Sequence, residues 1–111
     1  MAFIQKSLLS IYINENSKID SNSLYEFILH KAVENGIDGG SVFRGIMSYG
    51  KGHKIHSAKL LQLSMDLPVK IELVDYRDKL IKFYELINAN LVTRNLSALF
   101  SITDIDVLTN G

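Results

Sequence analysis

The stretch Gly39–Pro68 reads GGSVFRGIMSYGKGHKIHSAKLLQLSMDLP, and its composition differs from that of the rest of the chain. Five of the chain's seven glycines fall in its first half. No acidic residue occurs between Asp38 and Asp66, whereas four lysine or arginine side chains do. Two apolar runs flank a polar, basic centre over residues 50–57, and this pattern predicts two strands joined by a solvated loop.

Both apolar runs have the composition of strands. Val42–Tyr49 contains β-branched and aromatic residues, and Gly45 inside it predicts a bulge or a close approach by other backbone or by a ligand. Leu61–Leu67 alternates apolar and polar residues, which predicts a half-buried strand. Pro68 has no N–H group, so we expect it to break or bend the ladder before residues 69–74 continue as a strand.

The residues before this stretch predict one strand and one helix. Residues 7–13 are almost continuously apolar, which suits a central strand covered on both faces. From Leu24 onward apolar residues recur at helical spacing, with Ser23 and Glu26 at the spacing of a capping box. The pair Asn35–Gly36 predicts the end of this helix, because glycine adopts the left-handed conformation at no steric cost.

The C-terminal third predicts a second helix and a closing strand. Asp75 is a candidate N-cap, and Asp78 three residues later favours the positive end of the helix dipole. We expect the helix to end near Asn88–Asn90, and Leu91–Ser101 stays open between strand, loop and helix extension. Alternating residues over 102–107 predict a strand. The apolar stripe of the helix comprises Leu80, Phe83, Tyr84 and Ile87.

The predicted order of elements is strand, helix, strand, strand, helix, strand. This is the split βαβ arrangement of an α+β, ferredoxin-like βαββαβ sandwich, here with an elaborated hairpin between the second and third strands. With 111 residues, of which 47% are apolar and 22% charged, the chain is expected to form a single domain over residues 1–111.

Charge and composition exclude several classes of partner. Twelve basic and twelve acidic residues cancel, so we expect no nucleic-acid partner. The chain has no cysteine, which excludes disulfides and thiolate metal sites. No apolar run approaches the ~18 residues of a membrane span, and the N-terminus lacks a signal-peptide pattern. We therefore expect a cytoplasmic protein.

Two long runs of the sequence resemble the PII-like proteins, and among them a small branch of unknown function. The run Ala32–Gly50 matches the pattern A-x-x-x-G-I-x-G-x-x-V-x-R-G-I-x-G-(F/Y)-G, which is typical of that branch, except that Ser48 stands where the pattern has a glycine. The run Ser57–Asp75 follows S-x-x-L-L-x-L-S-x-D-L-P-V-x-I-E-x-V-D. Both patterns are specific, and each includes one of the predicted central strands.

The resemblance implies a ferredoxin-like fold and a homotrimer with a small-molecule site in each cleft between subunits. In PII-type relatives the connection between strands two and three is a flexible signalling loop. Adenine nucleotides (AMP, ADP or ATP) bind there between the loop base and a glycine-rich phosphate loop of the neighbouring subunit. By position, the matching residues at the loop base here are Arg44, Gly45, Tyr49 and Gly50.

The phosphate loop of the relatives is not matched in this chain. Residues 90–101, which follow the second predicted helix, contain no glycine. A cradle of backbone N–H groups needs residues that adopt unusual φ angles and leave room for the ligand. Arg94 is the positive charge that this segment offers in its place.

The loop itself offers further cations. Five basic side chains could hold a phosphate or a carboxylate, with Gly50 and Gly52 allowing backbone amides to approach it: Lys51, His53, Lys54, His56 and Lys59. The alternative is a solvated hairpin tip, where polar and basic residues are routine. His53 and His56 lie three residues apart, but without a third ligand at a recognisable spacing we expect no metal site.

Each charged residue that we single out in the strands has two possible roles, one functional and one structural. The planar guanidinium of Arg44 suits bidentate contact with a phosphate or carboxylate, and the alternative is an ion pair with Glu72 or Asp75. Asp104 and Asp106 lie on one strand face, where charge facing solvent is commoner than acid–base catalysis. The sequence has no nucleophile–base pair and no dinucleotide or phosphate-loop fingerprint, so we do not expect an enzyme.

Two functional hypotheses follow from these features. The first is a PII-like regulatory sensor that binds a small anionic ligand, an adenine nucleotide, in intersubunit clefts. It would signal through the 50–58 loop to a protein partner, such as a transporter or an enzyme. The alternative is a ligand-free structural trimer that docks a partner through the same loop.

Overall fold

A four-stranded antiparallel sheet forms the centre of the computed structural model, which describes residues 2–57 and 67–110. In order across the sheet, the strands are β4 (Gly39–Arg44), β7 (Pro68–Asp75), β1 (Ala2–Asn14) and β8 (Leu99–Thr109). Strand β7 lies between β4 and β1, as in the split βαβ arrangement. The predicted α+β, ferredoxin-like fold is confirmed.

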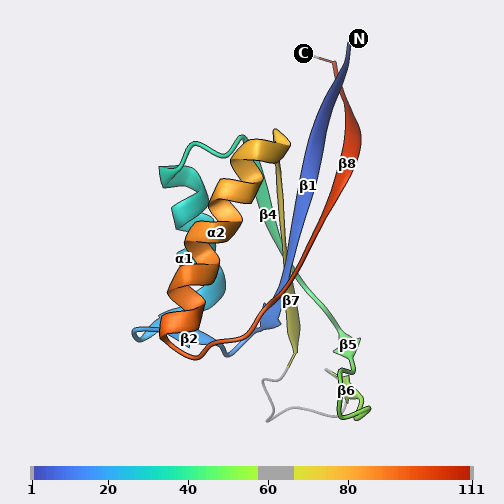
Figure 1. Ribbon diagram of the computed structural model, residues 1–111. Helices are drawn as coiled ribbons and strands as arrows, with labels where there is room; N and C mark the ends of the chain where they lie inside the picture. Colours follow the sequence, from blue (N-terminus) through green and yellow to red (C-terminus); the bar gives the residue numbers. More distant parts are fainter. Residues whose placement is uncertain (1, 58–66, 111) are drawn as a thin grey trace.

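Two helices cover one face of the sheet, and within the described residues the other face carries no helix (Figure 1). They are α1 (Leu24–Glu34) and α2 (Arg77–Thr93). Side chains at every second position of β1 and β7 point toward the helices and are buried, among them Leu9, Ile11 and Ile71. The prediction that residues 7–13 are covered on both faces is therefore not met within the described chain, where Tyr12 stays 38% exposed.

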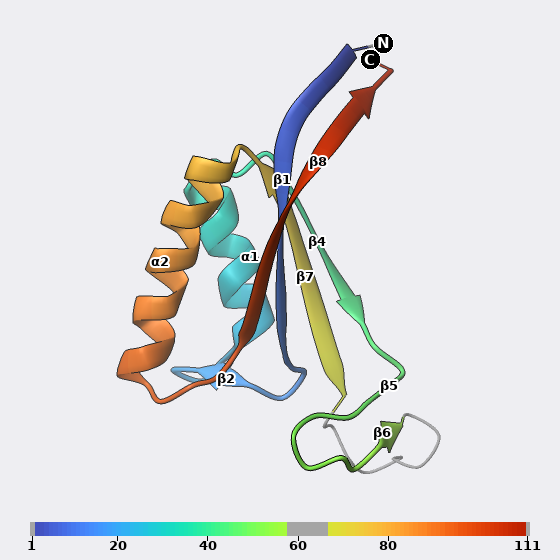
Figure 2. The ribbon, with the colours of Figure 1, turned by 45° about the vertical axis from the view of Figure 1, so that its right-hand side comes forward.

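Two short hairpins decorate the connections between the main elements. The connection from β1 to α1 contains β2 (Lys18–Ile19) paired with β3 (Asn22–Ser23). The connection from β4 to β7 contains β5 (Met47–Ser48) paired with β6 (His56–Ser57). This second hairpin lies beyond the end of the main sheet (Figure 2).

The second predicted strand is divided at Gly45. The ladder of β4 with β7 ends at Arg44, and the N–H of Gly45 donates to the carbonyl of Pro68 at 2.8 Å. A Cβ atom at Gly45 would lie 2.5 Å from Cγ of Pro68, so the predicted close approach of backbone is confirmed. Pro68 begins β7, where a missing N–H is tolerated. The predicted strand over residues 61–67 falls outside the described residues except for Leu67.

The first helix ends as predicted but begins differently. Ser23 occupies the N-cap position, yet its side chain makes no capping hydrogen bond, so the predicted capping box is wrong. Ser23 is paired with Lys18 in the short hairpin, and Leu24 N donates to the carbonyl of Ser17 at 2.9 Å instead. At the other end, Gly36 has φ of +68°, as a helix-terminating glycine requires.

The second helix begins at Arg77 and not directly after Asp75. Asp75 belongs to β7 and is only 1% exposed, so it is not the N-cap. Its carboxylate accepts hydrogen bonds from the backbone N–H of Tyr76 at 2.6 Å and from that of Asp38 at 2.9 Å. Asp75 thus ties the start of α2 to the loop between α1 and β4.

The end of the second helix and the uncertain segment after it are also settled. The helix continues past Asn88–Asn90 to Thr93, because Leu91 extends the buried stripe of Leu80, Phe83 and Ile87. Leu91–Ser101 divides into a last helical turn, a short connection over residues 94–98, and the first residues of β8. No helix in the described part of the chain combines the length and hydropathy needed to cross a membrane.

Candidate functional site

The base of the β4–β7 connection is built around Arg44 and Glu15. The guanidinium of Arg44 forms an ion pair with the carboxylate of Glu15, the residue that follows β1. The backbone N–H of Glu15 donates to the carbonyl of Leu67 at 2.8 Å. Glu15 therefore contacts both ends of the connection, one through its side chain and one through its backbone.

The predicted partners of Arg44 are wrong, and the strand register explains why. Arg44 lies opposite Val69, on the helix-facing side of the sheet, whereas Glu72 lies opposite Ser41 on the other face. Glu72 instead pairs with Lys70 at 2.9 Å. Asp75 lies at the far end of β7 and pairs with Lys79 at 3.1 Å.

The tip of the connection carries most of the remaining predicted site residues. Tyr49, Gly50, Lys51, His53 and Lys54 are all exposed. The N–H of His53 donates to the carbonyl of Gly50 at 2.9 Å, and the rings of Tyr49 and His53 lie 6.1 Å apart. Within the described residues neither lysine has a carboxylate partner. The tip thus presents two positive charges beside an exposed aromatic ring.

Arg94 lies away from the loop, at the end of α2. Its Nε and Nη2 atoms donate to the two carboxylate oxygens of Asp20 at 3.0 and 2.8 Å. The Arg94 guanidinium holds the pKa of Asp20 below its ordinary value, chiefly through these hydrogen bonds. In both ribbon views the end of α2 and the β5–β6 hairpin lie at the same end of the molecule, separated from each other (Figures 1 and 2).

The connection after α2 is closed by backbone hydrogen bonds and not by glycine. The N–H of Arg94 and that of Leu96 both donate to the carbonyl of Leu91, at 3.1 and 2.9 Å. The N–H of Asn95 donates to Val92 at 3.2 Å, and Asn95 itself adopts φ of +55°. These three N–H groups are already used, so this turn does not offer them to a phosphate.

Sequence reasoning missed Glu15 and Asp20. Both lie in the polar connection between β1 and α1, and each holds one of the two arginines that were singled out as ligand residues. Their acidic character in a turn after the first strand was the available signal, but the pairing depends on which elements end at the same end of the sheet. Among the described residues no group of three or more metal-ligating side chains is present.

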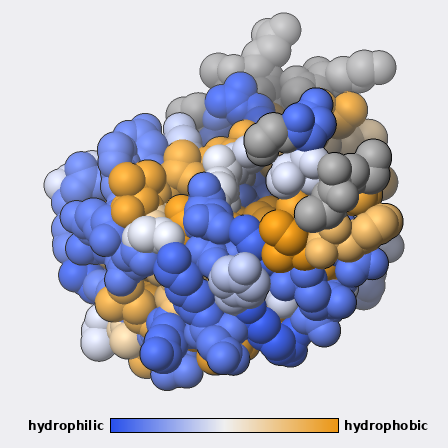
Figure 3. All heavy atoms as spheres, turned by 90° about the horizontal axis from the view of Figure 1, so that it is seen from above, coloured by the Kyte–Doolittle hydropathy of each residue, from blue (hydrophilic) through white to orange (hydrophobic). Residues whose placement is uncertain are grey.

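The opposite end of the molecule is polar and heavily paired. Seen from above, the end at which α2 begins shows mainly polar side chains, with apolar ones in separate areas (Figure 3). Lys6 pairs with Asp38 at 2.7 Å, and Arg77 pairs with Asp104 at 3.0 Å. A hollow of about 330 Å³ at this end is lined by Gln5, Lys6, Ser7, Tyr76, Arg77, Asp78 and Asp104.

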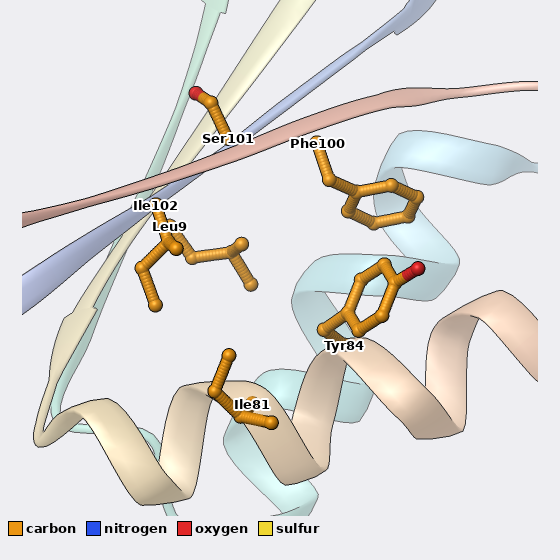
Figure 4. Close-up of a pocket in the computed structure, with 6 residues that line it drawn as sticks. All are labelled: Leu9, Ile81, Tyr84, Phe100, Ser101 and Ile102. Atoms are coloured by element: carbon orange, nitrogen blue, oxygen red, sulfur yellow. The ribbon is translucent and has the colours of Figure 1, made fainter.

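An apolar hollow of about 370 Å³ lies between α2 and the edge strand β8 (Figure 4). The rings of Tyr84 and Phe100 meet edge to face on one side of it, with centroids 4.8 Å apart. None of the described side chains that line it is charged, so it does not suit an anionic ligand. Its lining residues are Leu9, Ile81, Tyr84, Phe100, Ser101 and Ile102.

Comparison with protein families and individual proteins places the chain among relatives of unknown function. The DUF190 family (Uncharacterized ACR, COG1993) matches residues 6–107. A UPF0166 protein of Aquifex aeolicus is 33% identical over 108 residues, which is 97% of this chain and 98% of that protein. A UPF0166 protein of Methanocaldococcus jannaschii is 34% identical over 91 residues, covering 78% of this chain and 83% of the relative.

Solved structures of PII-like proteins share the fold at low sequence identity. CPII from Thiomonas intermedia, a nitrogen regulatory PII-like protein bound to ADP, AMP and bicarbonate, matches with a TM-score of 0.69 and 16% identity. The match covers 96% of this chain and 91% of CPII. A PII-like signalling protein from Thermus thermophilus matches with a TM-score of 0.69, 9% identity and coverage of 97% and 94%.

Proposed function

Because this chain belongs to the DUF190 family and has the PII-like fold, we propose that it is a PII-like regulatory protein. Its ligand is a small anion, an adenine nucleotide, bound in the clefts between the subunits of a cytoplasmic homotrimer. The observation that carries this proposal is the match over 96% of the chain to a PII-like protein bound to ADP, AMP and bicarbonate.

The residues at the loop end of the molecule suit an anionic nucleotide. Arg44 at the loop base has the planar fork that binds phosphate, and Gly45 keeps the backbone beside it close to Pro68. The exposed side chains of Lys51 and Lys54 add positive charge at the tip. The ring of Tyr49, 67% exposed, offers a face on which an adenine can stack.

A cleft between subunits brings together parts that one chain keeps apart. The end of α2 and the β5–β6 hairpin lie at the same end of the protomer (Figure 2), and in the proposed trimer Arg94 of one copy approaches the loop base of the next. The sheet face opposite the two helices supplies an apolar surface for such assembly, because Phe43, Leu99 and Tyr12 are 51%, 65% and 38% exposed there. A homotrimer covers this face.

The 50–58 loop is the proposed signalling element. Its described part lies beyond the sheet. Ile55 within it is 56% exposed, and Ile46 and Met47 just before it are 74% and 56% exposed. Exposed apolar side chains beside positive charges suit a protein partner, such as a transporter or an enzyme. Ligand binding at the loop base changes the order of the loop and thereby its contact with that partner.

Calorimetric titration of the purified protein with AMP, ADP and ATP tests the ligand, and light scattering on the same sample tests the trimer. We expect saturable binding of at least one nucleotide. Replacement of Arg44 and Lys51 by alanine should abolish binding while the trimer stays intact. Failure of all three nucleotides to bind at millimolar concentration contradicts the proposal.

A second candidate function is a ligand-free trimer that docks a partner through the loop. It is favoured by the fact that Arg44 and Arg94 already have carboxylate partners and that the turn after α2 has used its N–H groups. Under this alternative the Arg44 and Lys51 substitutions alter partner capture only. Nucleotide titration then gives no heat with either the wild type or the variants.

A further inference from the structure

We propose that the connection between β1 and α1 is an internal competitor for the anion site: Glu15 and Asp20 hold the guanidinium groups of Arg44 and Arg94, and an anionic ligand must displace them. The inference rests on the proposed function and adds a rule for which anions gain access. Both carboxylates come from one short segment, residues 15–20. Their arginine partners lie at the ends of β4 and α2, at the same end of the molecule (Figures 1 and 2).

The contact between Asp20 and Arg94 has the geometry of a bound ligand. Two parallel N–H groups of the guanidinium donate to the two carboxylate oxygens, at 3.0 and 2.8 Å. This is the arrangement in which arginine recognises a carboxylate or a phosphate group. Asp20 therefore occupies the donors of Arg94 that a ligand phosphate would use.

The contact between Glu15 and Arg44 is linked to the loop. Glu15 donates its backbone N–H to Leu67, and Gly45, next to Arg44, donates to Pro68. The side chain of Glu15 thus binds Arg44, where the connection between β4 and β7 begins, and its backbone binds Leu67, where that connection ends. An anion that binds Arg44 in place of Glu15 breaks the ion pair and leaves the hydrogen bond from the Glu15 N–H to Leu67. Ligand binding therefore changes the contacts at only one end of the connection between β4 and β7.

Both ion pairs are exposed enough to exchange with a ligand. In each pair one partner is well exposed: the side chain of Arg44 is 66% exposed and that of Asp20 is 67% exposed, whereas the side chains of Glu15 and Arg94 are 18% and 35% exposed. Exposed pairs of this kind are weak, so displacing one lowers ligand affinity by only about two- to five-fold. A phosphate group carrying close to two charges outcompetes a single carboxylate more readily than a monoanion does. Displacement costs every anion the same, so anions that bind the freed guanidinium groups strongly, such as phosphates, keep useful affinity, whereas weakly bound monoanions do not.

A purely structural role for the two acids predicts the opposite sign. If Glu15 and Asp20 only positioned the arginines, neutralising them would misplace the guanidinium groups and weaken anion binding. Competition predicts that neutralising them strengthens it. The direction of the change in affinity separates the two roles.

The test uses the full chain and the variants Glu15→Gln, Asp20→Asn and Glu34→Gln. Glu34 is the matched control, because it belongs to an exposed ion pair with Lys31 on α1 and its substitution changes net charge equally. ADP and inorganic pyrophosphate are the probes, titrated by calorimetry. We expect Glu15→Gln and Asp20→Asn each to tighten binding by about two- to five-fold, and Glu34→Gln to leave it unchanged.

A double substitution separates displacement from a general charge effect. In an Arg44→Ala background, where Lys51 is kept and weaker binding remains measurable, Glu15→Gln should no longer tighten binding. Binding by Glu15→Gln but not by the wild type also supports competition. Equal or weaker binding by both acid variants, with wild-type binding intact, overturns the inference and leaves the proposed function standing. If neither the wild type nor any variant binds either probe, both are overturned.

Discussion

The two ends of the molecule hold their charges in different ways. Where α2 begins, Asp75 is almost fully buried. Its carboxylate accepts hydrogen bonds from two backbone N–H groups and forms an ion pair with Lys79. At the loop end, Arg44 pairs with Glu15 and Arg94 pairs with Asp20 through side chains alone, and one partner of each pair is about two-thirds exposed. The first arrangement fixes the fold, because a buried carboxylate cannot lose its partners cheaply. The second can exchange its partners with a ligand.

The largest expected effect tests the buried end. Asp75→Asn should lower the free energy of unfolding by about 2–3 kcal/mol, since an amide places an NH₂ group against one of the two backbone donors. Urea denaturation at a fixed protein concentration measures this. Asp106→Asn, an exposed substitution on β8, should change stability by less than about 0.5 kcal/mol. Equal effects of the two substitutions would remove the distinction between the ends.

A smaller effect tests whether the backbone at the base of the β4–β7 connection is closely packed. Gly45→Ala should cost about 1–3 kcal/mol, because its Cβ would lie 2.5 Å from the Pro68 ring and force the two chains apart. Gly50→Ala is the control, since a Cβ there meets none of the described atoms within 4 Å. Denaturation midpoints of the two variants should differ clearly. If Gly45→Ala is as stable as the wild type, the loop base is less constrained than its contacts indicate.

The pH dependence of stability sharpens the comparison further. Burial alone would raise the pKa of Asp75, but hydrogen bonds from the Tyr76 and Asp38 N–H groups, together with Lys79, hold the pKa below its usual value. The carboxylate therefore stabilises the fold at neutral pH, and this contribution is lost as pH falls below about 4, through the lowered pKa. Urea midpoints measured from pH 7 to pH 3 should fall more steeply for the wild type than for Asp75→Asn.

The smallest expected effect belongs to the exposed pairs. Glu15→Gln and Asp20→Asn should leave the urea midpoint at neutral pH close to that of the wild type, because an ion pair with a well-exposed partner, here Arg44 or Asp20, contributes little to stability. A loss comparable to that of Asp75→Asn in either variant would show that these acids hold the fold together. They could then not serve as exchangeable partners of the two arginines.

The elements with strong local patterns were predictable from the sequence. The strand at 69–74, the helix Leu24–Glu34 with Gly36 just after its end, and the split at Gly45 follow from alternation, helical spacing and the missing Cβ of glycine. The N-caps of the two helices were not predictable. Ser23 is drawn into a two-residue hairpin and Asp75 into the end of β7, so tertiary contacts override their local preference for capping.

The ion-pair partners of the site arginines could also not be predicted from the sequence. Glu72 is near Arg44 in the paired strands, but the pleat places it on the opposite face of the sheet. Glu15 becomes its partner because β1 and β4, which flank β7, end at the same end of the sheet. Such a contact depends on the order and length of the strands, which local patterns do not determine.

A crystal structure of the protein grown with ADP tests the central claim most directly. The account predicts a trimer with the nucleotide in the cleft between two subunits, its phosphates on Arg44 and the carboxylate of Glu15 turned away from that guanidinium. A structure determined at millimolar ADP in which the clefts hold no nucleotide, and Glu15 remains on Arg44, would contradict it.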